Sequence, residues 1–428
     1  MKGEADVPKS IAIGSQCFSD MRQENCFLID KTMFIKDWWE NKDSVTLITR
    51  PRRFGKTLNM DMMNCFFSKE YKNRADLFEG LKIWEYEEYR KMQGTYPVIF
   101  LSFAGVKDIT YSKAVLSIGK KIRELYLRMK SIIKSNKFDE IEKEEYRSYM
   151  KEITEDNISD SLNVLCRYIY QRTGKKIIIF LDEYDAPLQE AYVNGYWDEM
   201  SQLMRNLLNN TFKTNEYLSR AILTGITRVS KESMFSDLNN LRICTMSSEE
   251  YSEYFGFTED EVFESMQEYG YTNKDEVKYW YDGFKIGNKT GMYNPWSIIN
   301  FLKTGKLEPY WSNTSSNSLA GKLLKEGDAE QKQDFEKLLR GETISKEIDE
   351  DIVFNQLDED SNAVWSLLAS SGYLKTNSIE DETYELEIVN HEVMRMFRKL
   401  VKGWFSKNRQ QYGSFIRSLL KDDVYSSK

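Results

Sequence analysis

Histidine is nearly absent from this sequence, since His391 is the only one in 428 residues. A histidine-dependent catalytic triad and a multi-histidine metal site are therefore close to excluded, and we interpret His391 as a surface or helix-cap residue. The five cysteines are scattered without a C-x-x-C pair. Neither a disulfide framework nor a zinc ribbon is indicated, and a reducing compartment fits best.

The chain also lacks an excess of positive charge and a long apolar run. Its net charge of -8 argues against a surface that coats nucleic acid, although a local basic groove stays open. The longest strongly apolar stretch, "IIIFL" at 177–181, is far shorter than the ~20 residues that span a bilayer. The first residues contain no apolar leader segment. We therefore expect a cytoplasmic protein with no membrane insertion.

Four short apolar runs alternate with helical patterns in the first half of the chain. The runs are "SVTLIT" (44–49), "YPVIFLSF" (96–103), "KKIIIFLDEYD" (175–185) and "SRAILTGITR" (219–228). Helices are expected at about 56–68, 111–134, 159–172 and 195–213. Apolar strands that alternate with helices indicate an α/β fold, in which helices cover both faces of a parallel sheet.

After residue 229 the sequence pattern changes to that of short, aromatic-rich helices and turns, such as "YWYDGFKIG" (279–287). At 428 residues the chain is also long enough for more than one domain. We therefore predict an α/β domain at 1–235 and a mostly helical, aromatic-rich domain at 236–428.

The first strand runs into "RPRRFGKTL" at 50–58, which has the features of a phosphate-binding loop. Lys56 would bind the β and γ phosphates of a nucleotide, Thr57 would bind Mg²⁺, and Gly55 would permit close approach of the backbone. Arg50 departs from the usual pattern, which begins with glycine, and Pro51 would stiffen the turn. A basic surface loop is the alternative interpretation.

The third strand ends in Asp182 and Glu183, at the position where parallel sheets place ligand chemistry. Asp182 would hold Mg²⁺ through water, and Glu183 would polarise the attacking water. The alternative is an acidic turn that caps a buried strand. The loop at 50–58 and the acidic pair at 182–183 each follow a predicted strand, and they occur in the order expected of a nucleotide-binding domain. Although each pattern is weak by itself, together they favour a nucleotide site.

Arg228 follows the fourth strand, which we expect to lie between the strands that precede Lys56 and Asp182. Its side chain would then contact the γ phosphate or stabilise transition-state charge. The alternative is a structural ion pair, for example with Asp237. The "NKFD" segment (136–139) matches a guanine-recognition motif but precedes the Asp182 strand, so ATP is the preferred nucleotide, although no residue identifies adenine directly.

The sequence resembles a family of bacterial AAA-ATPase-like proteins, whose members often carry a C-terminal PD-(D/E)XK nuclease-superfamily domain. The similar segments are "IAIGSQCFSDMRQENCFLIDKTMFI" (11–35), "RPRRFGKTL", "IIFLDEYDAPL" (178–188), "GITRVSKESMFSDLNNL" (225–241) and "YELEIVNHEV" (384–393). In that family the loop begins with arginine, so Arg50 is a family trait. The markers Asp30–Thr32 and Tyr281–Gly283 receive no role and are interpreted as turns and aromatic packing.

The resemblance implies a P-loop ATPase that binds ATP and Mg²⁺. Glu183, Lys56 and Arg228 would be catalytic, and Thr57 and Asp182 would hold the metal. The nucleotide would contact the whole loop: Arg50, Pro51, Arg52, Arg53, Phe54, Gly55, Lys56, Thr57 and Leu58.

We expect no counterpart of the nuclease-like part in this sequence, because "VKGWFSKNRQQYGSFIRSLLKDDVYSSK" (401–428) reads as an amphipathic helix and tail without the expected metal-binding strands. Whether the chain is naturally short or truncated before such a domain stays open. Hydrolysis would switch the conformation of the C-terminal domain and thereby regulate an associated nuclease or nucleic-acid process. The alternative is a nucleotide-binding interaction module that does not hydrolyse. The sequence leaves three questions open: whether the protein forms a homo-oligomer, whether it has a nucleic-acid or nuclease partner, and whether a neighbouring subunit supplies an arginine in trans.

Overall fold

The computed structural model describes most of the chain: residues 8–228, 235, 238–311, 321, 323–324, 327–350, 357, 360, 362–380 and 383–405. The chain divides into two compact units. The first contains residues 1–256, 286–289 and 350–359, and the second contains 257–285, 290–349 and 360–428.

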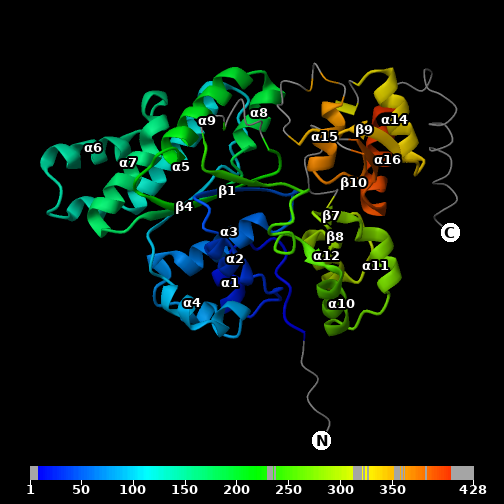
Figure 1. Ribbon diagram of the computed structural model, residues 1–428, viewed down its shortest axis with the longest axis horizontal. Helices are drawn as coiled ribbons and strands as arrows, with labels where there is room; N and C mark the ends of the chain where they lie inside the picture. The colour runs from blue at the N-terminus through cyan, green and yellow to red at the C-terminus, as the bar shows by residue number, and fades with distance from the viewer. Residues whose placement is uncertain are drawn as a thin grey trace, which may run out of the picture. The chain divides into compact units, whose positions relative to one another are not determined.

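Five parallel strands form the sheet of the first unit, in the order β2-β3-β4-β1-β5. Figure 1 labels β4 and β1 of this sheet. The five strands are β1 Val45–Thr49, β2 Val98–Ser102, β3 Ile177–Asp182, β4 Leu218–Gly225 and β5 Leu241–Cys244. β4 pairs with both β1 and β3, so the predicted strand order is confirmed. β5 was not expected from the sequence, because its four residues include an arginine and only Cys244 is buried.

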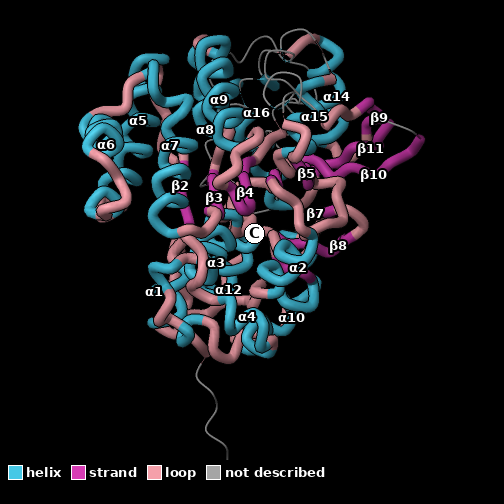
Figure 2. Tube along the Cα trace, turned by 60° about the vertical axis from the view of Figure 1, so that its left-hand side comes forward, coloured by secondary structure: helices cyan, strands magenta, loops and turns pink. Residues whose placement is uncertain are grey.

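Helices cover both faces of this sheet, as predicted (Figures 1 and 2). On one side lie α1 Phe18–Gln23, α2 Met33–Asn41, α3 Lys56–Phe67 and α4 Glu87–Met92. On the other side lie α5 Tyr111–Arg128, α6 Glu140–Lys151, α7 Glu155–Thr173, α8 Ala186–Asn194 and α9 Trp197–Phe212. Short 3₁₀ helices lie at Lys69–Tyr71, Ala75–Leu77, Lys82–Glu85 and Ile132–Lys134.

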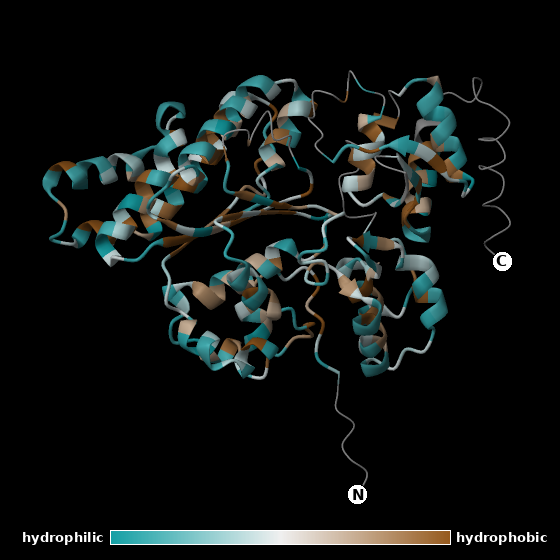
Figure 3. Cartoon of the chain, in the orientation of Figure 1, coloured by the Kyte–Doolittle hydropathy of each residue, from teal (hydrophilic) through white to brown (hydrophobic). Residues whose placement is uncertain are grey.

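The core of the first unit forms where the sheet meets α2 and α3. Every residue of β1 and β3 is buried, and Figure 3 shows brown, hydrophobic stretches along the strands of the central sheet. The ring of Trp38 lies 5.6 Å from that of Phe67 and 6.0 Å from that of Phe180. Burial of such large apolar side chains is the main favourable term in folding, so the sheet is a rigid support for the loops at its edge.

Two motifs noted in the sequence have structural roles. The carboxylate of Asp30 accepts hydrogen bonds from the amide (2.9 Å) and hydroxyl (2.6 Å) of Thr32 and from the amide of Lys82 (2.7 Å). In "NKFD", Asp139 is the N-cap of α6 and accepts a bond from the amide of Glu142 at 2.8 Å. Asp139 therefore caps a helix, which supports setting aside guanine recognition by this segment.

The second unit combines helices with two small three-stranded sheets, ordered β6-β8-β7 and β10-β11-β9 (Figure 2). The strands are β6 Phe257–Thr258, β7 Phe284–Ile286, β8 Lys289–Tyr293, β9 Ile344–Glu347, β10 Leu374–Glu380 and β11 Thr383–Ile388. The helices are α10 Glu259–Glu268, α11 Lys274–Tyr281, α12 Pro295–Thr304, α14 Ala329–Leu339, α15 Ala363–Ser370 and α16 His391–Phe405. Helices predominate, as predicted.

Aromatic packing explains the remaining markers of the second unit. Tyr281 ends α11, and its hydroxyl donates to the carbonyl oxygen of Glu308 at 2.8 Å. His391 begins α16 and stacks on Tyr279 with 4.6 Å between ring centroids. Burial lowers the pKa of His391. Tyr281 packs the unit, as interpreted from the sequence, whereas His391, interpreted as a surface or helix-cap residue, is half-buried within this aromatic packing.

No helix within the described part of the chain has the length and apolar character needed to cross a membrane. The C-terminal segment 406–428, expected to continue an amphipathic helix and form a tail, lies outside the described residues.

Candidate functional site

The loop between β1 and α3 joins a buried strand to the N-terminus of a helix, as a phosphate-binding loop does. Gly55 has φ +80°, and a Cβ there would meet no atom within 4 Å. Glycine is therefore required by the left-handed backbone rather than by close packing within the chain. Arg53 also has a positive φ, +66°. The turn leads into Lys56, the first residue of α3, where free helical amides attract anions.

Lys56 is folded back onto its own loop. Its side-chain Nζ donates to the carbonyl oxygens of Arg50 and Pro51, both at 2.8 Å, and the residue is only 7% exposed. Burial lowers the pKa of Lys56 to about 8, and the nearby carboxylate of Glu183 partly opposes this shift. The cation expected to bind phosphate is thus held at the loop, in an environment that makes its charge costly.

Thr57 and Asp182 are in direct contact, although 125 positions separate them in the sequence. The Thr57 hydroxyl donates to Oδ2 of Asp182 at 2.8 Å. Oδ1 of Asp182 accepts from the hydroxyl of Thr224 on β4 at 2.6 Å, and the Ser102 hydroxyl on β2 lies 3.4 Å from Oδ2. Asp182 is 0% exposed. The ends of β2, β3 and β4 therefore converge on one carboxylate beside the loop.

Glu183 follows β3 in an unusual backbone conformation, with φ +51°. Non-glycine residues adopt this left-handed region rarely, and such strain concentrates at functional sites. Burial raises the pKa of Glu183, and the neighbouring Asp182 raises it further, while the charges of Lys56 and Arg52 act in the opposite direction. Glu183 is therefore a carboxyl group whose basicity is increased, as a general base requires.

The donor set of this site fits Mg²⁺ better than a metal held by protein alone. Thr57 and Asp182 supply a hydroxyl and a carboxylate oxygen within 2.8 Å of each other. Among the described residues, no three His, Cys, Asp or Glu side chains gather to hold a metal. Mg²⁺ characteristically binds through one or two carboxylates together with substrate phosphates and water, which agrees with this sparse arrangement.

Arg50, expected among the nucleotide-binding residues, has its side chain turned away from Lys56 and into the sheet edge. Its guanidinium is 0% exposed and donates to carbonyl oxygens of Thr49 (2.8 Å), Cys244 (3.1 Å), Thr245 (2.7 Å) and Glu250 (3.3 Å). Burial lowers the pKa of Arg50 to about 10. The side chain thus links β1 to β5, and only the carbonyl group of Arg50 meets Lys56.

The other loop side chains divide between the core and the surface. Phe54 is fully buried, and Leu58 packs against the aromatic core. Arg52 is half-buried and donates from Nη2 to Oε1 of Gln189 at 3.2 Å, whereas Arg53 is exposed. Nucleotide contacts expected from Phe54 and Leu58 would therefore have to come from their backbone.

Arg228 lies three residues after β4, in a half-buried position. The turn before it is held by Asp185, which is 1% exposed and accepts from the amides of Ile226 (2.9 Å) and Thr227 (3.0 Å). The alternative partner Asp237 lies outside the described residues, so the role of Arg228 stays a prediction.

Sequence reasoning missed Asp185, Thr224 and Ser102. Asp185 belonged to the quoted "LDEYD" segment, but its function depends on a turn about 40 positions later in the chain. Thr224 and Ser102 could have been noticed as polar residues near the ends of otherwise apolar strands.

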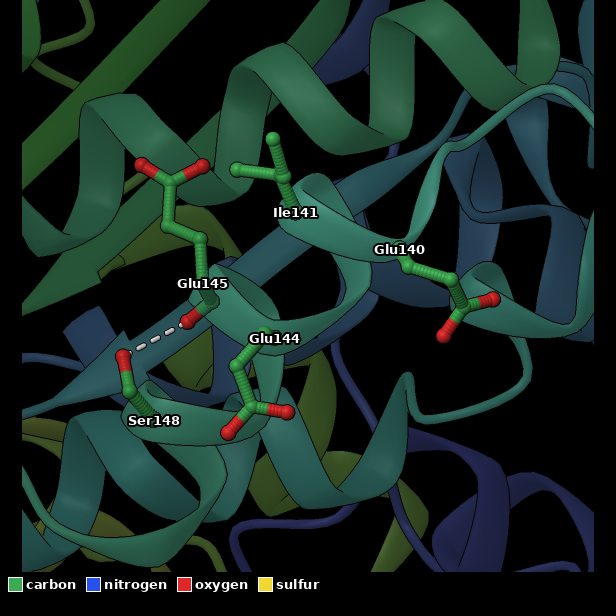
Figure 4. A pocket seen from close by; sticks show the side chains of 5 residues that line it. All are labelled: Glu140, Ile141, Glu144, Glu145 and Ser148. Carbon is green, nitrogen blue, oxygen red and sulfur yellow. Dashed lines mark hydrogen bonds between the residues drawn. The ribbon is translucent and has the colours of Figure 1, made fainter.

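A shallow groove on α6 offers a contrast to this site (Figure 4). Its lining residues are Glu140, Ile141, Glu144, Glu145 and Ser148. Ile141 is 82% exposed, and Glu145 pairs with Arg167 at 2.5 Å. The lining is acidic and would repel phosphate, so we assign this groove no part in nucleotide chemistry.

Comparison with known proteins agrees with the geometry. The family described as "Predicted AAA-ATPase" matches residues 12–235, a little over half of the chain. An uncharacterized protein in the vnfD 5' region of Azotobacter chroococcum mcd 1 is 27% identical over 327 residues, which cover 74% of this chain and 56% of that protein. The chain therefore spans about half the length of this relative.

The family match contains the loop at 50–58, the carboxylates at 182 and 183, and Arg228. Membership of such a family implies nucleotide binding in general terms. The expected resemblance is confirmed, and the chain belongs to the predicted AAA-ATPase family.

Proposed function

We propose that the first unit binds and hydrolyses ATP with Mg²⁺ at the loop formed by residues 50–58. The observation that carries this proposal is the 2.8 Å contact between the Thr57 hydroxyl and the Asp182 carboxylate, at the carboxyl edge of a parallel sheet. A strand, a loop, a helix N-terminus and a buried carboxylate meet there, and Lys56 lies beside them. This combination suits a triphosphate–magnesium complex.

Lys56 would move from the carbonyl oxygens of Arg50 and Pro51 to the β and γ phosphates. The amides at the start of α3 would bind the same phosphates, because they have no intrahelical partners. Thr57 and Asp182 would hold Mg²⁺, directly and through water respectively. The metal ion, when bound, neutralises charge on the phosphate oxygens.

Glu183 would accept a hydrogen bond from the attacking water and take its proton as the bond from the water oxygen to the γ phosphorus forms and the bond from that phosphorus to the ADP oxygen breaks, so that ADP and phosphate are released. Its raised pKa supports this role, because a buried carboxylate is a stronger base than one in water. Arg228, at the end of the β4 turn, would stabilise the negative charge that develops on the γ phosphate.

The test compares phosphate release by the wild type and by Glu183→Gln at saturating Mg-ATP, with nucleotide affinity measured separately by calorimetry. We expect binding to persist in the variant, while its turnover falls by about 100-fold or more. Glu144→Gln is the matched control, because its side chain is 75% exposed. Equal phosphate release by the wild type and Glu183→Gln would refute hydrolysis at this site.

The alternative of a binding module without hydrolysis is favoured by one observation. The buried Arg50 connects the loop to Cys244, Thr245 and Glu250, so a bound nucleotide could act as a structural element. In that case Mg-ATP would raise the unfolding temperature, but neither the wild type nor Glu183→Gln would release phosphate.

We further propose that nucleotide state at the loop changes the C-terminal region. Thr245 and Ser247 donate from their hydroxyls to the carboxylate of Glu350, at 2.6 and 2.8 Å. Glu350 belongs to the first unit, although the preceding β9 belongs to the second. Movement of the Arg50–Pro51 peptide, when Lys56 leaves it, would thus reach the chain that enters the second unit.

Hydrogen exchange tests this link. With Mg-ATP we expect altered protection at residues 241–250 and 344–350, and exchange confined to the 50–58 loop would argue against it. The proposed switch would regulate an associated nuclease or a nucleic-acid process. A homo-oligomer of this chain is part of the same proposal.

A further inference from the structure

The segment formed by α5 and the turn after it is strongly basic, although the chain as a whole is acidic. Residues 111–137 include eight lysines and arginines but only one acidic residue, Glu124, whereas the net charge of the chain is -8. Two of the eight have structural contacts, described below. We call the other six the α5 stripe: Lys113, Lys120, Lys121, Arg128, Lys130 and Lys134.

The α5 stripe lies on the side of the helix that faces away from the core. The side chains at 114, 118, 122 and 125 are buried, whereas Lys113, Lys120 and Arg128 are exposed. Spacings of seven and eight residues, about two helical turns, place these three cations on one face. Lys130 and Lys134, in the turn that follows, are exposed as well, and Lys121 is half-buried.

The cations of the stripe are not used to hold the fold together. No described residue forms a hydrogen bond or an ion pair with the side chain of any of the six. The other two basic residues of the segment do have such contacts. Arg123 donates from Nε to the carbonyl oxygen of Met150 at 2.7 Å, and Lys137 donates to the carbonyl oxygens of residues 171 and 172 at 3.1 and 3.4 Å.

The adjacent helix α6 shows a contrasting, charge-balanced surface. It packs against α5 (Figures 1 and 2). Glu140 pairs with Lys143 at 2.8 Å, and Arg147 lies 3.7 Å from Glu140 and 3.4 Å from Glu144. Such pairs at a spacing of three or four residues are typical of an exposed helix. These acids of α6 are therefore paired within their own helix, and the charge of the α5 stripe is available to an anion from solution.

The length of α5 favours an extended anion over a small one. The helix has 18 residues, so it is about 27 Å long at a rise of about 1.5 Å per residue. A small phosphorylated molecule would meet only one or two of its cations. A nucleic-acid duplex carries about one negative charge per 1.7 Å of its axis, so its backbone can follow the whole stripe.

The side chains around the cations favour a duplex over a single strand. Proteins that bind single strands stack the bases on aromatic side chains, and none of the exposed residues from 112 to 137 is aromatic. A surface that offers cations without stacking groups suits a backbone whose bases are already paired.

The same surface is poorly suited to a lipid membrane. A helix that lies on a membrane inserts a wide apolar face, and the apolar face of α5 is buried within the unit. Two apolar side chains lie among the cations, Leu116 at 54% and Leu127 at 37% exposure. Scattered apolar side chains of this kind are ordinary on protein surfaces, so a duplex remains the better partner.

We propose that the α5 stripe binds the phosphate backbone of a nucleic-acid duplex, independently of base sequence. Each contact between a cation and a phosphate would release condensed counterions, which supplies the affinity of such binding. The proposal does not depend on ATP hydrolysis, because no residue of the stripe belongs to the loop at 50–58. It gives the proposed nucleic-acid process a contact surface on the first unit.

The experiment measures binding of the full-length protein to labelled duplexes by fluorescence anisotropy. The probes are a DNA duplex of about 30 base pairs and an RNA duplex of the same sequence, in about 50 to 200 mM NaCl. For the wild type, we expect affinity for at least one duplex to fall on the order of 1,000-fold across this range, as about six phosphate contacts require. A duplex of scrambled sequence should bind equally well, and the two probes show whether DNA or RNA geometry fits the stripe.

A triple variant tests the stripe itself, with Lys113→Gln, Lys120→Gln and Arg128→Gln in one chain. At about 50 mM NaCl we expect its affinity to be lower by about 100-fold or more, and the slope of log affinity against log salt to be smaller by about three. The matched control removes the same charge from exposed lysines elsewhere in the first unit, and it should keep the wild-type slope. It carries Lys72→Gln, Lys82→Gln and Lys176→Gln.

Unfolding temperature and Mg-ATP affinity show whether the triple variant is folded. Both should match the wild type, because the three substituted side chains are exposed. If the triple variant is less stable, the single variants Lys113→Gln and Arg128→Gln give the same test, since each should reduce the salt slope by about one. The double variant Lys113→Arg with Lys120→Arg keeps the charge and should keep the binding.

Several results would overturn the proposal. They are no binding of either duplex by the wild type at about 50 mM NaCl, equal salt slopes for the wild type and the triple variant, and tighter binding to a single strand of the same length. Binding to phosphatidylserine vesicles without binding to a duplex would assign the stripe to a lipid surface instead. A wild type that binds a duplex but does not bind or hydrolyse Mg-ATP would overturn the ATPase proposal alone.

Discussion

The side of the phosphate loop that meets β5 differs from the side that meets α8, although each receives one arginine of the loop. On the β5 side, the guanidinium of Arg50 is fully buried and donates to four backbone carbonyl oxygens. On the α8 side, Arg52 is half-buried and donates to the amide of Gln189. Two arginines separated by one proline therefore differ in burial and partners.

The physical basis of this difference is desolvation. Burial of a charged group is costly unless hydrogen bonds replace its water, and Arg50 has backbone carbonyls as a permanent replacement. The charge of Arg50 is therefore used to connect β1 with β5. Arg52 is only half-buried and keeps part of its hydration, and its described hydrogen bond goes to the side chain of Gln189 rather than to backbone carbonyl oxygens.

The largest expected effect is a loss of Mg-ATP affinity when Lys56 is substituted. Lys56→Met should weaken Mg-ATP binding by about 100-fold or more, because a charged hydrogen-bonding group contributes roughly 1.5 to 3 kcal/mol per bond. Isothermal calorimetry measures the change. An affinity within a few-fold of the wild type would mean that the loop does not use this cation.

Stability separates the two arginines directly. Arg50→Met should lower the free energy of unfolding by about 1–3 kcal/mol, because buried carbonyl oxygens lose their donor. Arg52→Met should change it by about 0.5 kcal/mol or less. Urea denaturation of both variants tests the difference, and equal destabilisation would contradict a structural role that Arg50 has and Arg52 lacks.

The lowered pKa of Lys56 predicts a dependence on pH. Since the folded value is about 8 and the usual value 10.5, the unfolded chain binds more protons between these limits. The unliganded wild type should therefore become more stable relative to Lys56→Met as pH rises from 8 to 10.5. Over the same window, Mg-ATP affinity of the wild type should fall by about tenfold per pH unit, and Lys56→Met should lack this decline.

A smaller effect is expected on substitution of Glu350, which accepts a hydrogen bond from Thr245, a residue that Arg50 also contacts. Glu350→Gln keeps the shape of the side chain but removes the charge that accepts from Thr245 and Ser247. We expect a loss of about 1 kcal/mol or less in unfolding free energy, and a weaker response of residues 241–250 to nucleotide in hydrogen exchange. An unchanged exchange response would remove Glu350 from the proposed coupling.

The framework of the first unit could be predicted because its signals are local. β1, β3 and β4 are apolar runs, and the positions of Lys56 and Asp182 at their ends follow from the sequence. β5 was not predicted because it has only four residues, one of which is the exposed Arg242, and so short a run gives no clear pattern. The direction of the Arg50 side chain could not be foreseen, since its partners lie about 200 positions away.

The contacts that connect Arg52 with the turn after β4 could not be predicted for a similar reason, with one exception. Asp185 and Gln189 are four positions apart, a spacing that brings side chains together on a helix. That pair could have been proposed from the sequence. Its connection to Arg52 and to the amides after β4 required the two turns to be placed in three dimensions.

The groups expected to receive nucleotide have partners within the chain. Lys56 is bonded to two carbonyl oxygens of its own loop, and Thr57 is bonded to Asp182. If nucleotide binds as proposed, its uptake would exchange hydrogen bonds within the chain for bonds to the ligand, and the measured affinity would be the difference between these two sets of bonds. Product release would then be favoured, because the carbonyl oxygens of Arg50 and Pro51 could accept from Lys56 again as the phosphate departs.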